Sequence, residues 1–133
     1  MASNFKIATT LAASMLAALS VANSGKLRIY TTPQPANPQT AIGAVTLLAE
    51  LTMNATAFDV ADNVATARAV TKDSAADDTG TAAWFRLWAS NGTTPICDGS
   101  VGTSNCDLNL ATTSLVANVE VSITSFTITL PVA

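Results

Sequence analysis

The sequence predicts a mainly β fold, an antiparallel β-sandwich or small barrel of about seven strands, with one N-terminal amphipathic α-helix. Apolar residues recur at helical spacing up to residue 25 and alternate with polar residues after it. Turn signals then follow one another at intervals of roughly eight to twelve residues. The 133 residues suit a single domain, so we expect a helical segment at 1–25 joined directly to a β domain at 26–133.

The N-terminal segment is predicted to form a helix with one apolar face. The positions that share this face are Phe5, Ala8, Leu11, Ala12, Met15, Leu19 and Ala22. A secretory leader is the alternative, because Lys6 precedes an apolar run and small residues stand near Ala22. The run is too short, and too often interrupted by Ser and Thr, to span a membrane.

Alternating polar and apolar residues predict the strands, in chain order, at 26–31, 45–53, 64–71, 81–89, 95–98, 106–110 and 119–130. Residues 54–63 are expected to be irregular, with Phe58 anchored in the core. In the last strand the apolar phase slips by one residue, which predicts a β-bulge near Thr124–Ser125. Asn91-Gly92 predicts a hairpin, and Gly99 to Ser104 predicts a tight turn.

Three prolines mark the segment 32–43 as an extended surface loop, because proline cannot donate to a strand ladder. Pro33, Pro35 and Pro38 are therefore candidate contact residues for another protein.

Composition excludes several classes of function. The chain has no histidine, which rules out a Ser-His-Asp triad, a Cys-His pair and a histidine metal ligand. Two cysteines cannot complete a zinc site. The net charge of −3 argues against binding nucleic acid through its phosphates. Only 11% of the residues are charged, and such a surface suits packing against other proteins. We expect no enzyme activity, cofactor or metal.

Two groups of acidic and amide residues allow a cation site, but turn chemistry explains them more simply. Asp73, Asp77 and Asp78 lack the alternating spacing of a calcium loop and fit a solvated turn. The second group consists of turn formers and outward-facing strand residues, namely Asp98, Asn105, Asp107 and Asn109.

Cys97 and Cys106 lie on either side of the predicted Gly-rich turn. In a hairpin they would face each other and could form a disulfide. The alternative, which we favour, is two small reduced residues in a cytoplasmic product.

Trp84, Arg86 and Trp88 share one face of the strand at 81–89, while Phe85 and Leu87 share the other. The stripe is either a protein interface, since Trp and Arg are enriched in binding hot spots, or a second core layer with Arg86 stacked on tryptophan. In the second case the N-terminal helix is the expected cover.

The chain resembles a family of small structural proteins of tailed bacteriophages over most of residues 25–131. The blocks that carry the resemblance are Lys26–Thr31 (KLRIYT), Pro33–Ala36 (PQPA), Leu47–Leu51 (LLAEL), Val64–Ala67 (VATA), Trp84–Leu87 (WFRL), Asp98–Ser104 (DGSVGTS), Asp107–Leu110 (DLNL) and Val121–Pro131 (VSITSFTITLP). The two cysteines depart from the pattern, which leads us to expect small or aliphatic residues there.

The resemblance implies a non-enzymatic virion protein, assembled in the bacterial host cytoplasm. The expected role is capsid decoration, or cement, through contacts with the major capsid protein or neighbouring virion proteins. A homo-oligomer is expected, with a trimer as one form, and neither nucleic acid nor membrane as a partner. The alternatives are a neck or tail component (collar or fibre base), a secreted carbohydrate-binding module with Trp84 and Trp88 as sugar platform, and, more remotely, a hydrolase using Asp98 and Asp107.

Overall fold

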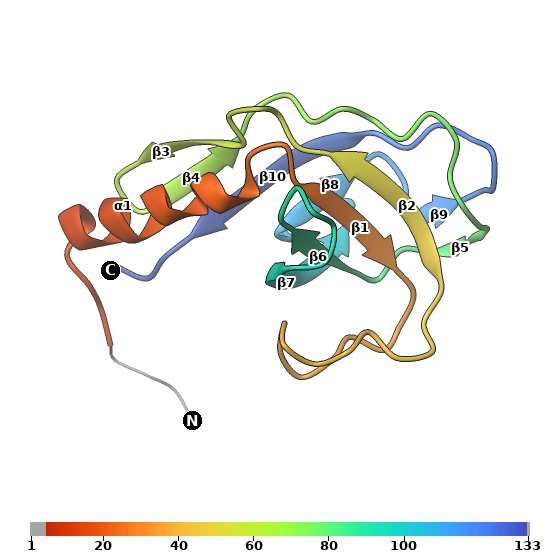
Figure 1. Cartoon of the computed structure of the whole chain (residues 1–133), viewed down its shortest axis with the longest axis horizontal. Helices are drawn as coiled ribbons and strands as arrows, with labels where there is room; N and C mark the ends of the chain where they lie inside the picture. The colour runs from red at the N-terminus through yellow and green to blue at the C-terminus, as the bar shows by residue number, and fades with distance from the viewer. Residues whose placement is uncertain (1–4, 133) are drawn as a thin grey trace.

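A computed structural model describes residues 5–132 and confirms a mainly β chain with one N-terminal helix (Figure 1). Helix α1 continues as the short 3₁₀ helix η1 at Ala18–Ala22. The elements are α1 (Thr9–Ala17), β1 (Lys26–Tyr30), β2 (Leu47–Thr52), β3 (Phe58–Ala61), β4 (Val64–Ala67), β5 (Gly80–Thr81), β6 (Trp84–Trp88), β7 (Pro95–Gly102), β8 (Leu108–Leu110), β9 (Ser114–Leu115) and β10 (Ile123–Thr129).

Eight of these strands form one curled sheet, in the order β2-β1-β6-β7-β8-β10-β4-β3, which makes a half-barrel. The strands β5 and β9 pair in a small second sheet. Neighbours in the large sheet are antiparallel except for β7 and β8, which run parallel with Val101 opposite Leu108. The hairpin predicted between 95–98 and 106–110 is therefore wrong. Strand β7 runs on through Gly99 to Gly102, where a turn was expected.

The core lies on the inner side of the curled sheet. Leu27 and Ile29 of β1 and Phe85 and Leu87 of β6 are almost completely buried there. The ring of Phe126, in β10, packs edge-on against Phe85 and Phe58, with ring centroids 5.1 and 5.4 Å apart. Phe58 thus anchors the core as expected, but it belongs to strand β3, which the sequence does not predict.

The predicted bulge in the last strand is confirmed. The pairing of β10 with β8 shifts register between Ile123 and Ser125. Beyond this point β10 pairs with β4 on its other side, from Thr127 to Thr129. The slip in apolar phase therefore marks the bulge itself, and β10 keeps pairing with β8 up to Phe126 before it pairs with β4.

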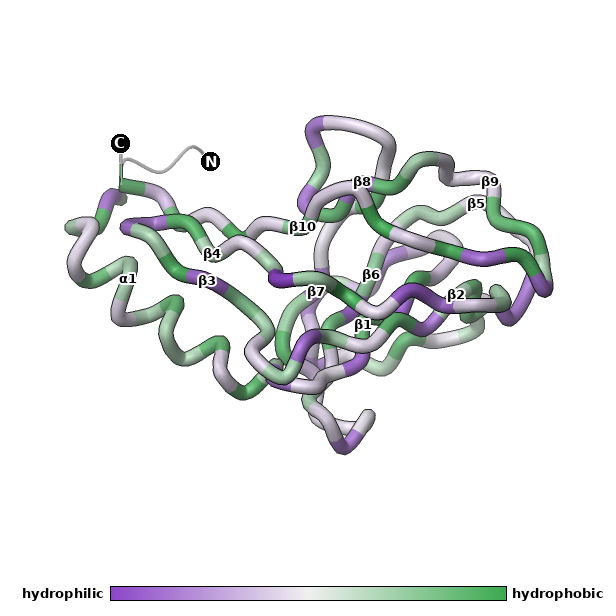
Figure 2. The backbone as a smooth tube through the Cα atoms, turned by 90° about the horizontal axis from the view of Figure 1, so that it is seen from above, coloured by the Kyte–Doolittle hydropathy of each residue, from purple (hydrophilic) through white to green (hydrophobic). Residues whose placement is uncertain are grey.

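The apolar face of the N-terminal helix differs from the prediction. Ala12, Leu16 and Ala22 are the residues that α1 and η1 bury, while Leu11 and Met15 are about half exposed. The buried stripe is rotated because α1 packs against β3 and β4 at the side of the sheet, as Figures 1 and 2 show. Residues 1–4 of the predicted helical segment lie outside the described residues.

Gly25 follows the helical segment at the corner that leads into β1. The left-handed residue at this corner is Ser24, with φ of 56°. A Cβ atom at Gly25 would collide with the backbone oxygens of Trp88 and Ala22. Glycine is therefore required here for close approach of two backbones.

Candidate functional site

The outer face of the half-barrel carries a row of four charged residues on adjacent strands. Arg28 lies opposite Glu50 on one side and opposite Arg86 on the other, and Arg86 lies opposite Asp98. The row therefore reads acid, base, base, acid across β2, β1, β6 and β7. Each arginine bonds the acid on its outer side, with Nε–Oε2 and Nε–Oδ1 distances of 2.6 Å.

Arg86 is the centre of this row and is only 2% exposed. Its guanidinium holds both carboxylate oxygens of Asp98, because Nη2 also donates to Oδ2 at 2.9 Å. Nη1 donates to the backbone carbonyl of Thr40 at 2.7 Å, and Nη2 also donates to that of Asn37 at 3.2 Å. The hydrogen bond to Asp98 raises the pKa of Arg86 above its usual value. A permanently charged group thus ties the proline-rich loop to the sheet.

Aromatic rings fill the space around the two guanidinium groups. Tyr30 and Trp84 stack with ring centroids 4.6 Å apart. The Arg86 guanidinium carbon lies 5.5 Å from the ring centre of Trp84 and 5.6 Å from that of Trp88, and Arg28 covers Trp88 at 5.3 Å. These distances are typical of cation–π contacts. We call Arg28, Tyr30, Trp84, Arg86 and Trp88 the arginine–aromatic cluster.

The cover of this cluster is the proline-rich loop at 32–43, not the N-terminal helix as predicted. Besides the two bonds from Arg86, the indole Nε1 of Trp84 donates to the carbonyl of Thr31 at 2.7 Å. Pro33 is exposed, and Pro35 and Pro38 are partly exposed. The loop therefore presents an outer surface to solvent, while two hydrogen bonds from Arg86 hold its inner backbone and one from Trp84 holds the residue just before it.

The sequence leaves two alternatives for the stripe of Trp84, Arg86 and Trp88. In the structure the stripe forms a second core layer, with Arg86 stacked on tryptophan. Trp84 and Arg86 are buried, and Trp88 is partly buried. A sugar platform made of Trp84 and Trp88 would need both rings on the surface, and the first is 1% exposed. All buried side-chain polar atoms in the described part of the chain have hydrogen-bond partners. The bonds from Arg86 to the carbonyls of Asn37 and Thr40 make the cluster a support for the loop.

The acidic side chains of the two groups identified in the sequence accept hydrogen bonds in turns or pair with single partner residues. Asp73 accepts bonds from the backbone N–H groups of Glu50 and Ala75, and burial raises the pKa of Asp77. Asp98 forms an ion pair with Arg86. Asp107 instead accepts hydrogen bonds from the backbone N–H and the hydroxyl group of Ser100, each at 3.0 Å. Asp98 and Asp107 therefore have separate partners. Within residues 5–132 no three acidic or sulfur ligands come together for a metal.

Both cysteines are free thiols in the structure. The parallel pairing of β7 and β8 removes the hairpin on which a Cys97–Cys106 disulfide depends. Cys106 turns back onto Gly102, where a Cβ atom would lie 2.6 Å from its sulfur. Burial, helped by the charges of Asp98 and Asp107, raises the pKa of Cys97 to about 12, so this thiol stays protonated at neutral pH.

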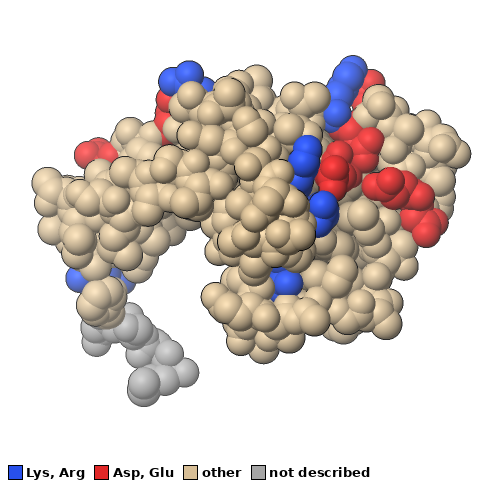
Figure 3. Space-filling model, viewed as in Figure 1, with Lys and Arg blue, Asp and Glu red and all other residues tan. Residues whose placement is uncertain are grey.

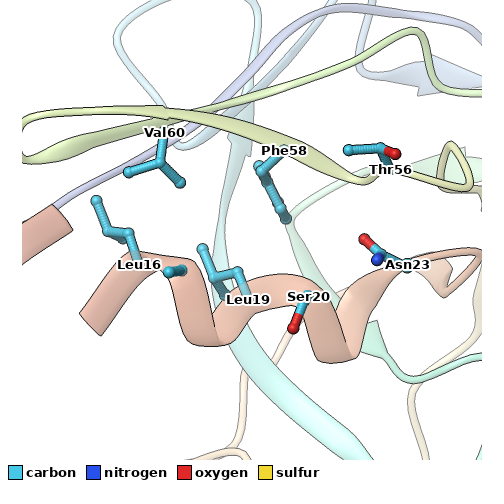
Figure 4. Close-up of a pocket in the computed structure, with 8 residues that line it drawn as sticks. Leu16, Leu19, Ser20, Asn23, Thr56, Phe58 and Val60 are labelled. Carbon is cyan, nitrogen blue, oxygen red and sulfur yellow. The ribbon is translucent and has the colours of Figure 1, made fainter. Parts of the chain in front are cut away.

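Two of the hollows on the surface of the described residues lie away from the cluster. One, of about 120 Å³, lies between the helical segment and β3 and is lined mainly by apolar side chains, including Leu16, Leu19 and Phe58 (Figure 4). The other, of about 330 Å³, lies beside the β10 bulge and includes Arg68, which pairs with Asp59.

Among the described residues no helix has the length and apolar character needed to cross a membrane.

No protein-family model, curated protein or solved structure matches the chain significantly.

Proposed function

We propose that this chain is a non-enzymatic structural protein of a tailed-bacteriophage virion. Its role is capsid decoration: it binds the major capsid protein or neighbouring virion proteins, and copies of itself, through protein–protein contacts. Support comes from the resemblance of the sequence blocks and from a surface on which charge is confined to a few places. In the view of Figure 3 charged side chains gather mainly around β1 and β2, while the front of the α1 side is almost uncharged.

The observation that carries the proposal is the buried bond from Arg86 to the proline-rich loop. No charged residue occurs between Arg28 and Glu50, yet the buried guanidinium of Arg86, besides pairing with Asp98, donates to two backbone carbonyls of this segment. Burial of an ion pair is weak support for stability but can fix one conformation. A loop fixed in advance loses less entropy on binding, so we assign its outer surface, with Pro33 and Pro35, to the partner.

A decoration protein does not need tight individual contacts. Many copies on one particle bind a repeated surface, and linked weak contacts give firm attachment. An uncharged loop with proline, glutamine and asparagine residues can supply such contacts without a charged partner surface. Attachment through it is accordingly expected to depend little on salt.

Quantitative mass spectrometry of gradient-purified virions tests the proposal. A copy number comparable with that of the major capsid protein is expected. A small fixed number per particle would overturn the decoration role and place the protein at the neck or tail. Absence from the particle would overturn the virion proposal altogether.

The loop assignment has its own test. Binding of the purified protein to virion heads stripped of it is measured for Gln34→Glu, which puts a charge into the exposed loop. The matched control, Asn118→Asp, adds the same charge in an exposed loop outside residues 32–43. We expect at least tenfold weaker binding for the first variant and unchanged binding for the control. Equal binding by both variants would remove the loop from the interface.

A further inference from the structure

We infer that the exposed stripe of the N-terminal helix, together with the apolar groove beside it, is a contact between two copies of this chain. The inference specifies the self-association contained in the proposed function, and it is tested on the isolated protein. Its failure is therefore distinguishable from failure of the virion assignment.

The stripe consists of apolar side chains that the fold of one chain leaves uncovered. Leu11 and Met15 are 52% and 50% exposed, and Val21 is 59% exposed. Leu11, Met15 and Ala18 are spaced by four and three residues, which places them on one side of an α-helix. Val21 follows after one turn of 3₁₀ helix, whose period is three. The stripe thus runs along the whole helical segment.

The groove lies next to the stripe, between the helical segment and the edge strand β3. Leu16 and Leu19 of the helical segment point toward Phe58 and Val60 of β3 in Figure 4. Val60 is itself 37% exposed at the rim. The hollow has a volume of about 120 Å³. Since an apolar cavity of about 150 Å³ takes up benzene, there is room here for the end of a leucine or methionine side chain.

A second copy is the occupant that this arrangement fits. The same chain carries projecting apolar side chains and, beside them, a hollow of their size. A two-fold contact uses one patch on both partners, so Met15 of each copy can enter the groove of the other. No charged residue lies between Lys6 and Lys26, so two such segments meet without burying a charge. A charged partner surface would lose its solvation here without gaining an ion pair.

The size of the patch sets the strength of the contact. The helical segment is about 20 Å long, by the rise per residue of helices. The area of one side of this helical segment, together with the rim of β3, is smaller than the roughly 800 Å² that each partner buries in a standard stable interface. The association is therefore expected to be concentration-dependent in solution and to be reinforced where copies are held close together on a particle.

Sedimentation velocity over a wide range of concentration tests this. The wild-type protein is expected to pass from monomer to dimer, and Met15→Glu to remain monomeric at every concentration. Ser14→Glu is the matched control, because it adds the same charge to an exposed residue beside the stripe, on the polar side of the helix; it is expected to associate like the wild type. A monomeric wild type, or equal loss in both variants, would overturn the inference.

Cross-linking makes the result independent of any effect of a buried charge. Met15→Cys, in a background without Cys97 and Cys106, is treated with a short bismaleimide, and Ser14→Cys is the control. Covalent dimers are expected in high yield from the first and not from the second. Equal yields would overturn the contact, and a trimer in sedimentation would overturn its two-fold arrangement.

Discussion

Arg28 and Arg86 lie directly opposite each other on β1 and β6, although like charges in this position normally destabilise a strand pair. Each guanidinium is neutralised from its outer side, Arg28 by Glu50 and Arg86 by Asp98. The Trp88 ring lies near both guanidinium groups. The four charges are therefore one unit, and their contributions to stability should differ according to burial.

Removing the charge of Arg86 is expected to destabilise the protein strongly. Arg86→Met leaves Asp98, whose side chain is 4% exposed, buried without a partner. Breaking a buried ion pair costs about 3–5 kcal/mol. Urea unfolding followed by tryptophan fluorescence measures the loss. A change below about 1 kcal/mol would contradict the central role of this pair.

The double variant Arg86→Met/Asp98→Leu separates stability from loop order. Replacing both charges by apolar groups of similar size is often nearly neutral, so most of the unfolding free energy is expected to return. The carbonyls of Asn37 and Thr40 still lack their donor. Proteinase K is therefore expected to cut within 32–43 faster than in the wild type. Wild-type resistance of that loop would show that other contacts fix it.

The two acids of the row should respond differently to loss of charge. Glu50 pairs with Arg28 near the surface, where the two side chains are 36% and 24% exposed. Glu50→Gln is expected to cost no more than about 1 kcal/mol, whereas Asp98→Asn should cost about 3–5 kcal/mol. Urea unfolding of both variants at low and high salt checks this, and only the small effect of Glu50→Gln should shrink with salt. Equal costs would contradict the burial difference.

Gly102 and Cys106 should be energetically coupled. A methyl group at Gly102 would lie 2.6 Å from the Cys106 sulfur, so Gly102→Ala is expected to cost about 1–3 kcal/mol through overpacking. Cys106→Ala removes the sulfur, and in that background the same change should cost much less. A double-mutant cycle of unfolding free energies measures the coupling. Additive effects would mean that the backbone, rather than the sulfur, limits this position.

The sequence predicts well those parts of the fold in which polar and apolar residues alternate strictly. Alternation located β1 and β6, and the phase slip located the bulge at Thr124, because a shift by one residue exchanges the two faces of a strand. Strand β3 was missed, since Phe58–Ala61 is a short edge strand of mixed polarity. It pairs with β4 in a tight hairpin through the turn at Asp62-Asn63, where Asp62 has φ of 54°, and this turn was not predicted.

Glycines misled the prediction around residues 99–102. Gly99 and Gly102 resemble turn residues in sequence, but both lie in β7, where a side chain at Gly99 would lie 2.5 Å from the Phe85 ring. In a strand such glycines mark close approach. The sequence predicts one part of the candidate site, because alternation places Trp84, Arg86 and Trp88 on one face of their strand. The bonds from Arg86 to the loop join residues more than forty positions apart, and local pattern carries no signal for them.

Stability should fall at alkaline pH because of Cys97. Burial raises the pKa of its thiol from 9.0 to about 12 in the folded protein. Between these values the unfolded chain loses a proton that the folded chain keeps, so the unfolding free energy falls as pH rises, by up to about 1.4 kcal/mol per pH unit. Burial also raises the pKa of Tyr30 above 10.0, which adds a loss of the same sign at higher pH.

Urea unfolding under reducing conditions, at a series of pH values from neutral upward, isolates the thiol. The decline that begins near pH 9 is expected to be absent from Cys97→Ala and present in Cys106→Ala, which removes the other thiol. The Cys97→Ala protein should then decline only above about pH 10, where the unfolded Tyr30 begins to ionise. Parallel curves for the wild type and Cys97→Ala would mean that the folded protein releases the Cys97 proton as readily as the unfolded chain.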